Sequence, residues 1–228
     1  INSVVGSLTS RSALKYGLDK PNLFCEDPLK YVLHKDLNVP YDFEASLASK
    51  VKELLSQNNT TERNQNLLIN GYQTAGNLFD VENDLTTEIQ EIIRLEVENY
   101  RSQFHESEEG FLTKLPLNYS LYGWLICMQN GGELKPHIHD QGWISGSLYI
   151  RVPPKPNVDS GNLVVSLGEE SDATEDRQNL KRSIDVRTGS MVLFPSSTTH
   201  HTTPFVGLEQ RIVLAFDVIA EDHSLKLF

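Results

Sequence analysis

The sequence is poor in cysteine and lacks long apolar runs. Its 228 residues include only two cysteines, Cys25 and Cys127, which are far apart in the chain. Isolated cysteines argue against a disulfide framework and favour a reducing compartment. No apolar run approaches the roughly 20 residues that cross a bilayer, and Ile1–Gly6 lack the basic segment and apolar core of a signal peptide. We therefore expect a cytoplasmic protein that makes no membrane contact.

Positive charge is also scarce. The chain carries 20 Lys and Arg residues against 31 Asp and Glu residues, a formal net charge of −11. The basic residues form no stripe of the kind that binds phosphates, so we expect no nucleic-acid partner. A hydrophobic content of 39% is typical of a globular protein, and the length suits a single domain over residues 1–228.

Within this domain, residues 1–117 are expected to form a helical support region. Residues 43–56 and 84–104 each repeat apolar side chains every three or four positions, which predicts two amphipathic helices with one buried stripe. Asp42 and Asp84 stand where N-caps are expected, because a short carboxylate accepts hydrogen bonds from the free amides of a first turn.

Residues 118–220 instead show short strands separated by turn signals such as Gly131-Gly132 and Pro153-Pro154. Seven or eight strands at this spacing indicate a sandwich or jelly roll, whose apolar outer face the two helices would cover. The chain is therefore expected to be mainly β with flanking helices, an α+β protein. The expected strands are 120–128, 133–139, 143–152, 162–167, 183–186, 190–194 and 211–218, and the expected exposed loops are the polar segment 58–65 and the acidic segment 168–178.

Three histidines and one arginine are the candidate functional residues. His137 and His139 stand two positions apart on a predicted strand, so their side chains point to the same face. His200, on a distant segment, would complete a metal site there. A lone histidine is more often structural, but this combination favours metal binding. Arg211, on an aliphatic strand, would place a fixed positive charge beside the metal, as a site for an acidic co-substrate requires.

Alternation within the strands predicts which side chains face inward. The even positions of 144–152 are mostly aliphatic and should pack against the helices, whereas Ser145 and Tyr149 should point into the barrel. Arg211 shares its face with small residues, which indicates a pocket with one charged anchor. An unpaired buried charge is costly, so Arg211 needs a protein carboxylate or an anionic ligand.

Two sets of residues resemble the active site of the 2-oxoglutarate/Fe(II)-dependent oxygenase superfamily. Lys135–His139 and Gly142–Tyr149 resemble its first half, and Leu193–Ser196 with His200 and Arg211 resembles its second half. The similarity is greatest to an uncharacterised bacterial and phage group with the pattern H-x-H…SG-x-x-Y…FPS…H…R. It covers most of the strand-rich part of the chain.

This resemblance implies a double-stranded β-helix, with Fe(II) as the metal and 2-oxoglutarate as co-substrate. It implies that His137 and His200 bind the metal and that His139 occupies the place of the usual Asp or Glu. It also implies that Arg211 pairs with the distal carboxylate of 2-oxoglutarate, because a planar guanidinium suits a two-pronged contact. Ser145 and Tyr149 would add hydroxyl donors to that carboxylate.

The third metal ligand has alternatives. Strand alternation aims Asp140 away from the metal and favours His139, but a β-bulge after His139 would bring Asp140 to the ion instead. A third arrangement uses two histidines and water, with His139 behind them.

The leading functional hypothesis is a dioxygenase that hydroxylates an unidentified small molecule or peptide while converting 2-oxoglutarate to succinate. The alternative is a cupin-like protein whose three histidines bind Zn, Ni or Fe for chemistry without 2-oxoglutarate. A third possibility is a degenerate barrel that acts only as a binding module. Arg211 favours the first hypothesis over the second, because a keto acid needs such an anchor. The three retained candidate ligands argue against the third.

Overall fold

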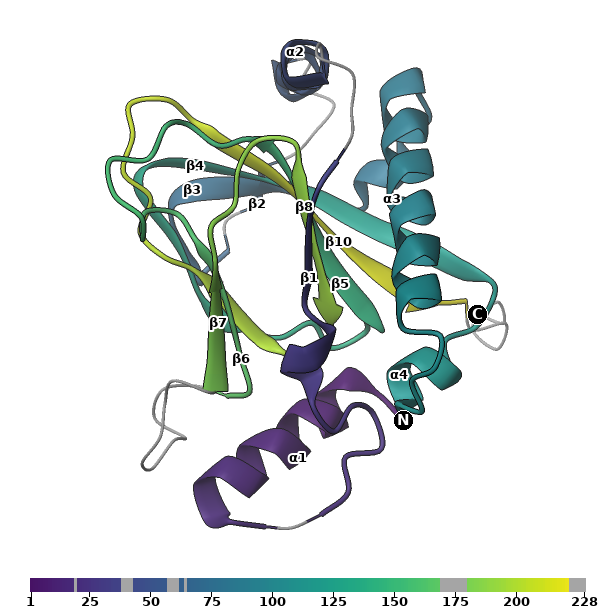
Figure 1. Ribbon diagram of the computed structural model, residues 1–228. Helices are drawn as coiled ribbons and strands as arrows, with labels where there is room; N and C mark the ends of the chain where they lie inside the picture. Colours follow the sequence, from purple (N-terminus) through teal and green to yellow (C-terminus); the bar gives the residue numbers. More distant parts are fainter. Residues whose placement is uncertain (19, 38–42, 57–61, 64, 169–179, 222–228) are drawn as a thin grey trace.

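The computed structural model describes residues 1–18, 20–37, 43–56, 62–63, 65–168 and 180–221. Within them the strands curl into a barrel-like jelly roll with helices on its outside (Figure 1). Asp42 and most of the predicted loops 58–65 and 168–178 lie outside the described residues.

The helices are α1 (Ser3–Tyr16), η1 (Pro28–Tyr31), α2 (Phe43–Ser56), η2 (Leu78–Asp80), α3 (Asp84–Gln103) and α4 (Gly110–Thr113). The strands are β1 (Leu33–Asp36), β2 (Glu62–Arg63), β3 (Leu68–Thr74), β4 (Tyr119–His137), β5 (Ile144–Arg151), β6 (Leu163–Ser166), β7 (Lys181–Ile184), β8 (Ser190–Pro195), β9 (Thr199–Thr202) and β10 (Arg211–Ala220).

One long strand, β4, connects the two sheets of the jelly roll. Its first part pairs with β10 and its last part with β9, so one sheet has the order β1-β8-β5-β10-β4 and the other β4-β9-β6-β7. The predicted division into two strands at Gly131-Gly132 is wrong. Gly131 has a φ of 75°, and the register of β4 shifts near this position against both β3 and β9. A glycine bend lets the strand pass between sheets without a turn.

Helices lie on the outer side of the β5–β10 sheet (Figure 1), and apolar side chains from both fill the space between them. Val51 of α2 and Ile89 of α3 are fully buried there, together with Ile144 and Leu148 of β5. The prediction that the even positions of β5 face the helices is therefore confirmed. Burial of such side chains contributes about 1.5–3 kcal/mol each.

The two predicted helices are also confirmed, with one difference at the start of α3. Asn83, rather than Asp84, is the N-cap, because its backbone is extended and its side chain accepts the Thr86 amide in a capping box. Asp84 is the first helical residue, where its charge still favours the positive end of the helix.

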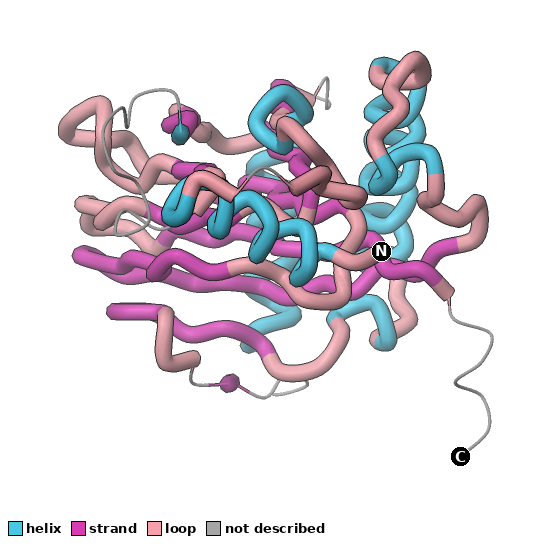
Figure 2. The backbone as a smooth tube through the Cα atoms, turned by 90° about the horizontal axis from the view of Figure 1, so that it is seen from below, coloured by secondary structure: helices cyan, strands magenta, loops and turns pink. Residues whose placement is uncertain are grey.

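Helix α1 was not predicted from the sequence. Asn2 caps its first turn, and Gly17, with a φ of 63°, ends it. Figure 2, seen from below, shows this helix near the N-terminus, in front of the strands. Ser3 Oγ lies 2.8 Å from the carbonyl of His139 and 3.0 Å from that of Asp140, so α1 holds the loop that follows β4. None of the helices in the described part of the chain is both long and apolar enough to cross a membrane.

Candidate active site

Three histidines meet inside the barrel. His137, the last residue of β4, lies directly opposite His200 of β9 in the strand register, and their ring centroids are 4.2 Å apart. His139 lies two residues beyond the end of β4, with its ring 5.3 Å from that of His137 and 4.8 Å from that of His200. One possible ligand atom from each ring lies within 4.8 Å of the others. This group can hold a metal ion.

The hydrogen bonds of the three rings determine which nitrogen is free. The Nδ1 atoms of His137 and His200 lie 2.8 Å and 3.1 Å from the carbonyls of Lys135 and Thr198. A carbonyl only accepts, so both Nδ1 atoms carry the proton. His139 Nδ1 lies 2.6 Å from Asp217 Oδ1, which likewise accepts. Each ring therefore keeps an Nε2 lone pair for a metal, and each Nδ1 contact fixes the orientation of its ring.

Burial keeps two of these rings neutral. Burial, with the neighbouring His139 as the second cause, lowers the pKa of His137 to about 4. Burial also holds the pKa of His200 well below its ordinary value, with His137 as the second cause. A protonated imidazole cannot bind a metal, so this environment favours the form that can.

The structure brings His139, not Asp140, into the cluster. Asp140 is exposed at the rim, and the Ser3 contacts hold the backbone of both residues. His139 is not on the strand, as alternation had suggested, but in the loop that follows it.

Arg211 lies at the start of β10 and is 2% exposed. Its described contacts are all neutral: Nη2 donates to the Gly161 carbonyl at 3.3 Å, Nη1 lies 3.6 Å from Met128 Sδ, and the guanidinium lies 5.3 Å from the centre of the Tyr149 ring. Its Nε has no hydrogen-bond partner among the described residues. Burial lowers the pKa of Arg211. A buried guanidinium with these neighbours is suited to an anionic ligand.

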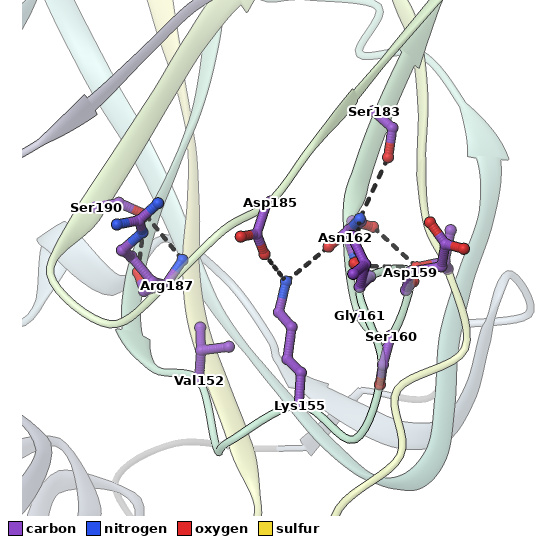
Figure 3. Close-up of polar contacts among 12 residues, drawn as sticks. Val152, Lys155, Asp159, Ser160, Gly161, Asn162, Ser183, Asp185, Arg187 and Ser190 are labelled. Atoms are coloured by element: carbon purple, nitrogen blue, oxygen red, sulfur yellow. Dashed lines mark hydrogen bonds and ion pairs between the residues drawn. The ribbon is translucent and has the colours of Figure 1, made fainter.

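The turn that contacts Arg211 is itself held by a polar network, drawn in Figure 3. Lys155 Nζ lies 2.6 Å from both Asn162 Oδ1 and Asp185 Oδ1. The Asn162 amide also donates to Ser183 Oγ at 3.3 Å. Gly161 has a φ of 66° in this turn, a conformation that glycine adopts without strain. This network thus holds the Gly161 carbonyl in place, so it cannot shift together with the Arg211 side chain.

Tyr149 is buried beside Arg211. Burial raises the pKa of its hydroxyl to about 12, while Arg211 and Ser147 act in the opposite direction as polar neighbours. Ser147, which the sequence analysis did not single out, lines the same cavity. Two hydroxyl groups therefore lie on the side of the cavity where the guanidinium lies.

Ser145 lies elsewhere. Its hydroxyl donates to Asp217 Oδ1 at 2.6 Å and lies 3.0 Å from His139 Nδ1 and 2.8 Å from Ser196 Oγ. The structure therefore groups Ser145 with the histidines rather than with Arg211. Asp217 was missed as a site residue. Strand alternation nevertheless puts it on the same inward face as Arg211, six positions further along β10.

The histidines, Arg211 and Tyr149 line one cavity of about 620 Å³ between the sheets. Trp124 extends the wall next to the three histidines, with its ring centroid 5.3 Å from that of His139. The Tyr122 ring lies beside that of Trp124, tilted by 55° with the centroids 5.9 Å apart, and Tyr122 is 39% exposed. The cavity is large enough for a keto acid and part of a second molecule.

Known proteins with a similar sequence or fold agree with a site for a metal ion and a keto acid. Residues 122–217 match the model of the family described as "Putative 2OG-Fe(II) oxygenase". This segment contains every candidate residue of the site. No curated protein sequence is similar enough to count as a match.

Solved structures show the same fold. A prolyl-4-hydroxylase from Pseudomonas putida superimposes with a TM-score of 0.59 at 14% identity, over 84% of this chain and 94% of that chain. A prolyl hydroxylase from Trichoplax adhaerens, in complex with a hypoxia inducible factor peptide fragment, gives 0.56 at 12% identity over 95% and 91%. HygX from Streptomyces hygroscopicus, with nickel, 2-oxoglutarate and hygromycin B bound, gives 0.50 at 10% identity over 86% and 89%. With this double-stranded β-helix fold and the family match over residues 122–217, the strand-rich part of the chain is similar to the 2-oxoglutarate/Fe(II)-dependent oxygenases, a superfamily of enzymes whose cofactors are Fe(II) and 2-oxoglutarate.

Proposed function

We propose that the protein is a dioxygenase that hydroxylates a small molecule or a peptide and converts 2-oxoglutarate to succinate and carbon dioxide. The observation that carries this proposal is the pairing, within one cavity, of three Nε2 lone pairs with a buried arginine that has only neutral neighbours among the described residues. The neighbour with a peptide fragment and the neighbour with hygromycin B keep both substrate classes open.

The residues fit the two cofactors. His137, His139 and His200 would hold Fe(II) through their Nε2 atoms. The three nitrogens already lie within 4.8 Å of one another, so small side-chain movements would bring them onto one ion. The unpartnered Nε of Arg211 supports a contact with the distal carboxylate of 2-oxoglutarate.

The remaining side chains would bind and orient. Arg211 would grip the distal carboxylate in a two-pronged contact, and the hydroxyls of Tyr149 and Ser147 would donate to it. Trp124 would shield the metal side of the cavity from water and support the substrate. When bound, Fe(II) and 2-oxoglutarate supply the oxidation: one oxygen atom of O₂ enters a substrate C–H bond and the other enters succinate. The histidines would keep their Nδ1 protons throughout, so the ring orientations would persist.

The first test is a pair of measurements on the whole protein. Calorimetry should show that 2-oxoglutarate binds when Mn(II), a redox-inert stand-in for Fe(II), is present, and that His200→Ala abolishes this binding while His34→Ala does not. With Fe(II), candidate small molecules and peptides should be screened for succinate release above the level seen without substrate. Metal binding without any 2-oxoglutarate binding would reject the proposal and favour the cupin-like alternative.

A further inference from the structure

His139 differs from the other two histidines in what holds it. The Nδ1 protons of His137 and His200 go to backbone carbonyls, whereas that of His139 goes to the carboxylate of Asp217 at 2.6 Å. Asp217 is 7% exposed. Burying a carboxylate is unfavourable unless hydrogen bonds or opposite charges compensate for the lost water. Asp217 therefore needs such partners besides His139.

Ser145 binds the same carboxylate oxygen as His139, and Ser196 in turn contacts Ser145. Ser145 Oγ donates to Asp217 Oδ1 at 2.6 Å, and Ser196 Oγ lies 2.8 Å from Ser145 Oγ. Both serines are fully buried. Gly142 closes the group, because a Cβ at that position would overlap Ser196 Oγ. The oxygen that faces His139 therefore receives two hydrogen bonds and has little freedom to move.

Separate parts of the fold bring these groups together. Ser145 and Asp217 are direct partners in the register between β5 and β10, and His139 comes from the loop after β4. The α1 residue Ser3 holds the backbone of that loop. The sheet residue Asp217 thus fixes the ring nitrogen of His139, and the helix residue Ser3 fixes its backbone carbonyl.

The charges within the cavity give this arrangement a consequence. Fe(II) carries +2, 2-oxoglutarate −2 and Arg211 +1, while three neutral histidines add nothing, so the group would carry +1 inside a mostly buried site. The carboxylate of Asp217 brings the sum to zero. In a site built from two histidines and one carboxylate, that negative charge sits on the metal itself. Here the same charge lies one imidazole ring away.

We propose that Asp217 is the positioning residue of the metal site: it orients His139 through the Nδ1 hydrogen bond and supplies the negative charge that a carboxylate ligand supplies elsewhere, with Ser145 holding it in place. The proposal rests on the proposed function only in requiring that a metal binds the three histidines. Partners of this kind typically change metal affinity by about 10- to 100-fold when they are removed.

The first experiment measures Mn(II) affinity by calorimetry in the absence of 2-oxoglutarate. Asp217→Asn keeps an oxygen that accepts from His139 but removes the charge, and it should weaken Mn(II) binding by about 10- to 100-fold. Ser145→Ala should weaken it by a smaller factor. Asp36→Asn, a matched change at a carboxylate that is 64% exposed on β1, should leave it unchanged.

The second experiment identifies the histidine that responds. In the Co(II)-loaded protein the three Nδ1 protons give strongly shifted, exchangeable proton NMR signals. Asp217→Asn and Ser145→Ala should both move the same single signal, and His139→Ala should remove it. If Asp217 had only a structural role, its replacement would shift none of the three Nδ1 proton signals, or would shift all three together.

The outcomes separate cleanly. Mn(II) affinity within twofold of the wild type in Asp217→Asn, with unmoved signals, overturns the proposal. Complete loss of metal binding by a folded Asp217→Asn protein, as severe as in His137→Ala, also overturns it, because Asp217 would then be a ligand. If Asp217→Asn does not fold, an unmoved His139 signal in Ser145→Ala overturns it. Normal Mn(II) binding by His137→Ala would instead reject the metal site and the proposed function.

Discussion

Replacement of Arg211 by methionine should remove most of the affinity for 2-oxoglutarate and leave metal binding intact. The guanidinium is buried, and its described contacts are a carbonyl at 3.3 Å, a thioether sulfur at 3.6 Å and an aromatic ring at 5.3 Å. None of these groups neutralises its charge. Methionine is unbranched, flexible and apolar and replaces most of the arginine stem, so the change removes the charge while keeping much of the packing between Met128 and Tyr149.

The expected loss follows from the burial of the pair. Truncating one partner of a buried charge pair costs about 2–5 kcal/mol, which corresponds to a roughly 30- to 4,000-fold weaker Kd. The free protein should respond differently. Because an unpaired buried charge is itself unfavourable, the metal-free Arg211→Met protein should be no less stable than the wild type.

Thermal unfolding with Mn(II) present measures both effects at once. At 100 times its Kd, 2-oxoglutarate should stabilise the wild type by about 2.7 kcal/mol, or roughly 5–10 °C in Tm for a chain of this size. At the same concentration Arg211→Met should gain no more than about 1 kcal/mol, or roughly 2–4 °C. Arg187→Met, at a side chain that is 62% exposed, is the control and should keep the full shift.

Two results would refute this reasoning. A full 2-oxoglutarate shift in Arg211→Met would mean that the co-substrate does not use the buried cation. A marked loss of Tm in the metal-free variant would mean that Arg211 already has a compensating partner. Calorimetric titration of Mn(II) alone must give the same affinity in both proteins for either result to be interpreted.

Three further outcomes are expected. Because the pKa of His137 is lowered to about 4 in the folded metal-free protein, the unfolded chain binds a proton that the folded chain does not between about pH 6.5 and pH 4. His137 alone should therefore contribute a fall of about 3 kcal/mol in the free energy of unfolding in urea as the pH falls through this window, in addition to the contribution of His200, and a His137→Gln variant with the same slope as the wild type would contradict this. His200→Ala should lose Mn(II) binding in calorimetry, whereas His201→Ala, at the next position of β9, should keep it; equal loss in both would contradict the cluster. A Cβ at Gly146 would overlap the Phe216 ring, so Gly146→Ala should lower the urea midpoint by an amount equal to about 1–3 kcal/mol of overpacking, and an unchanged midpoint would show that the sheet relaxes freely.

Strand periodicity was sufficient to predict which side of the sheet each residue of β5 faces. Side chains alternate with period two, so the aliphatic set containing Ile144 and Leu148 had to face one way and Ser145 and Tyr149 the other. The structure confirms this division, with the aliphatic set against the helices. The same rule, extended by two positions beyond Ala215, gives Asp217 the inward face of β10, but the sequence analysis did not identify this residue or its partner.

Local signals were less reliable where a chain segment serves two neighbours. Gly131-Gly132 resembles a turn in sequence, but pairing of β4 with both β10 and β9 makes it a bend within one strand. The end of β4 was also not predicted correctly. The strand ends at His137, and His139 is held by Ser3 and Asp217 rather than by strand geometry.

The position of each inward residue along the barrel was decided by tertiary structure alone. Ser145 and Tyr149 share a face but lie roughly 14 Å apart along β5, since a strand rises about 3.4 Å per residue. The register pairs Tyr149 with Val213, near Arg211, and Ser145 with Asp217, at the other end of β10. Periodicity determines the face of a side chain, whereas its neighbour across the sheet depends on the hydrogen-bond register between strands that are distant in the sequence.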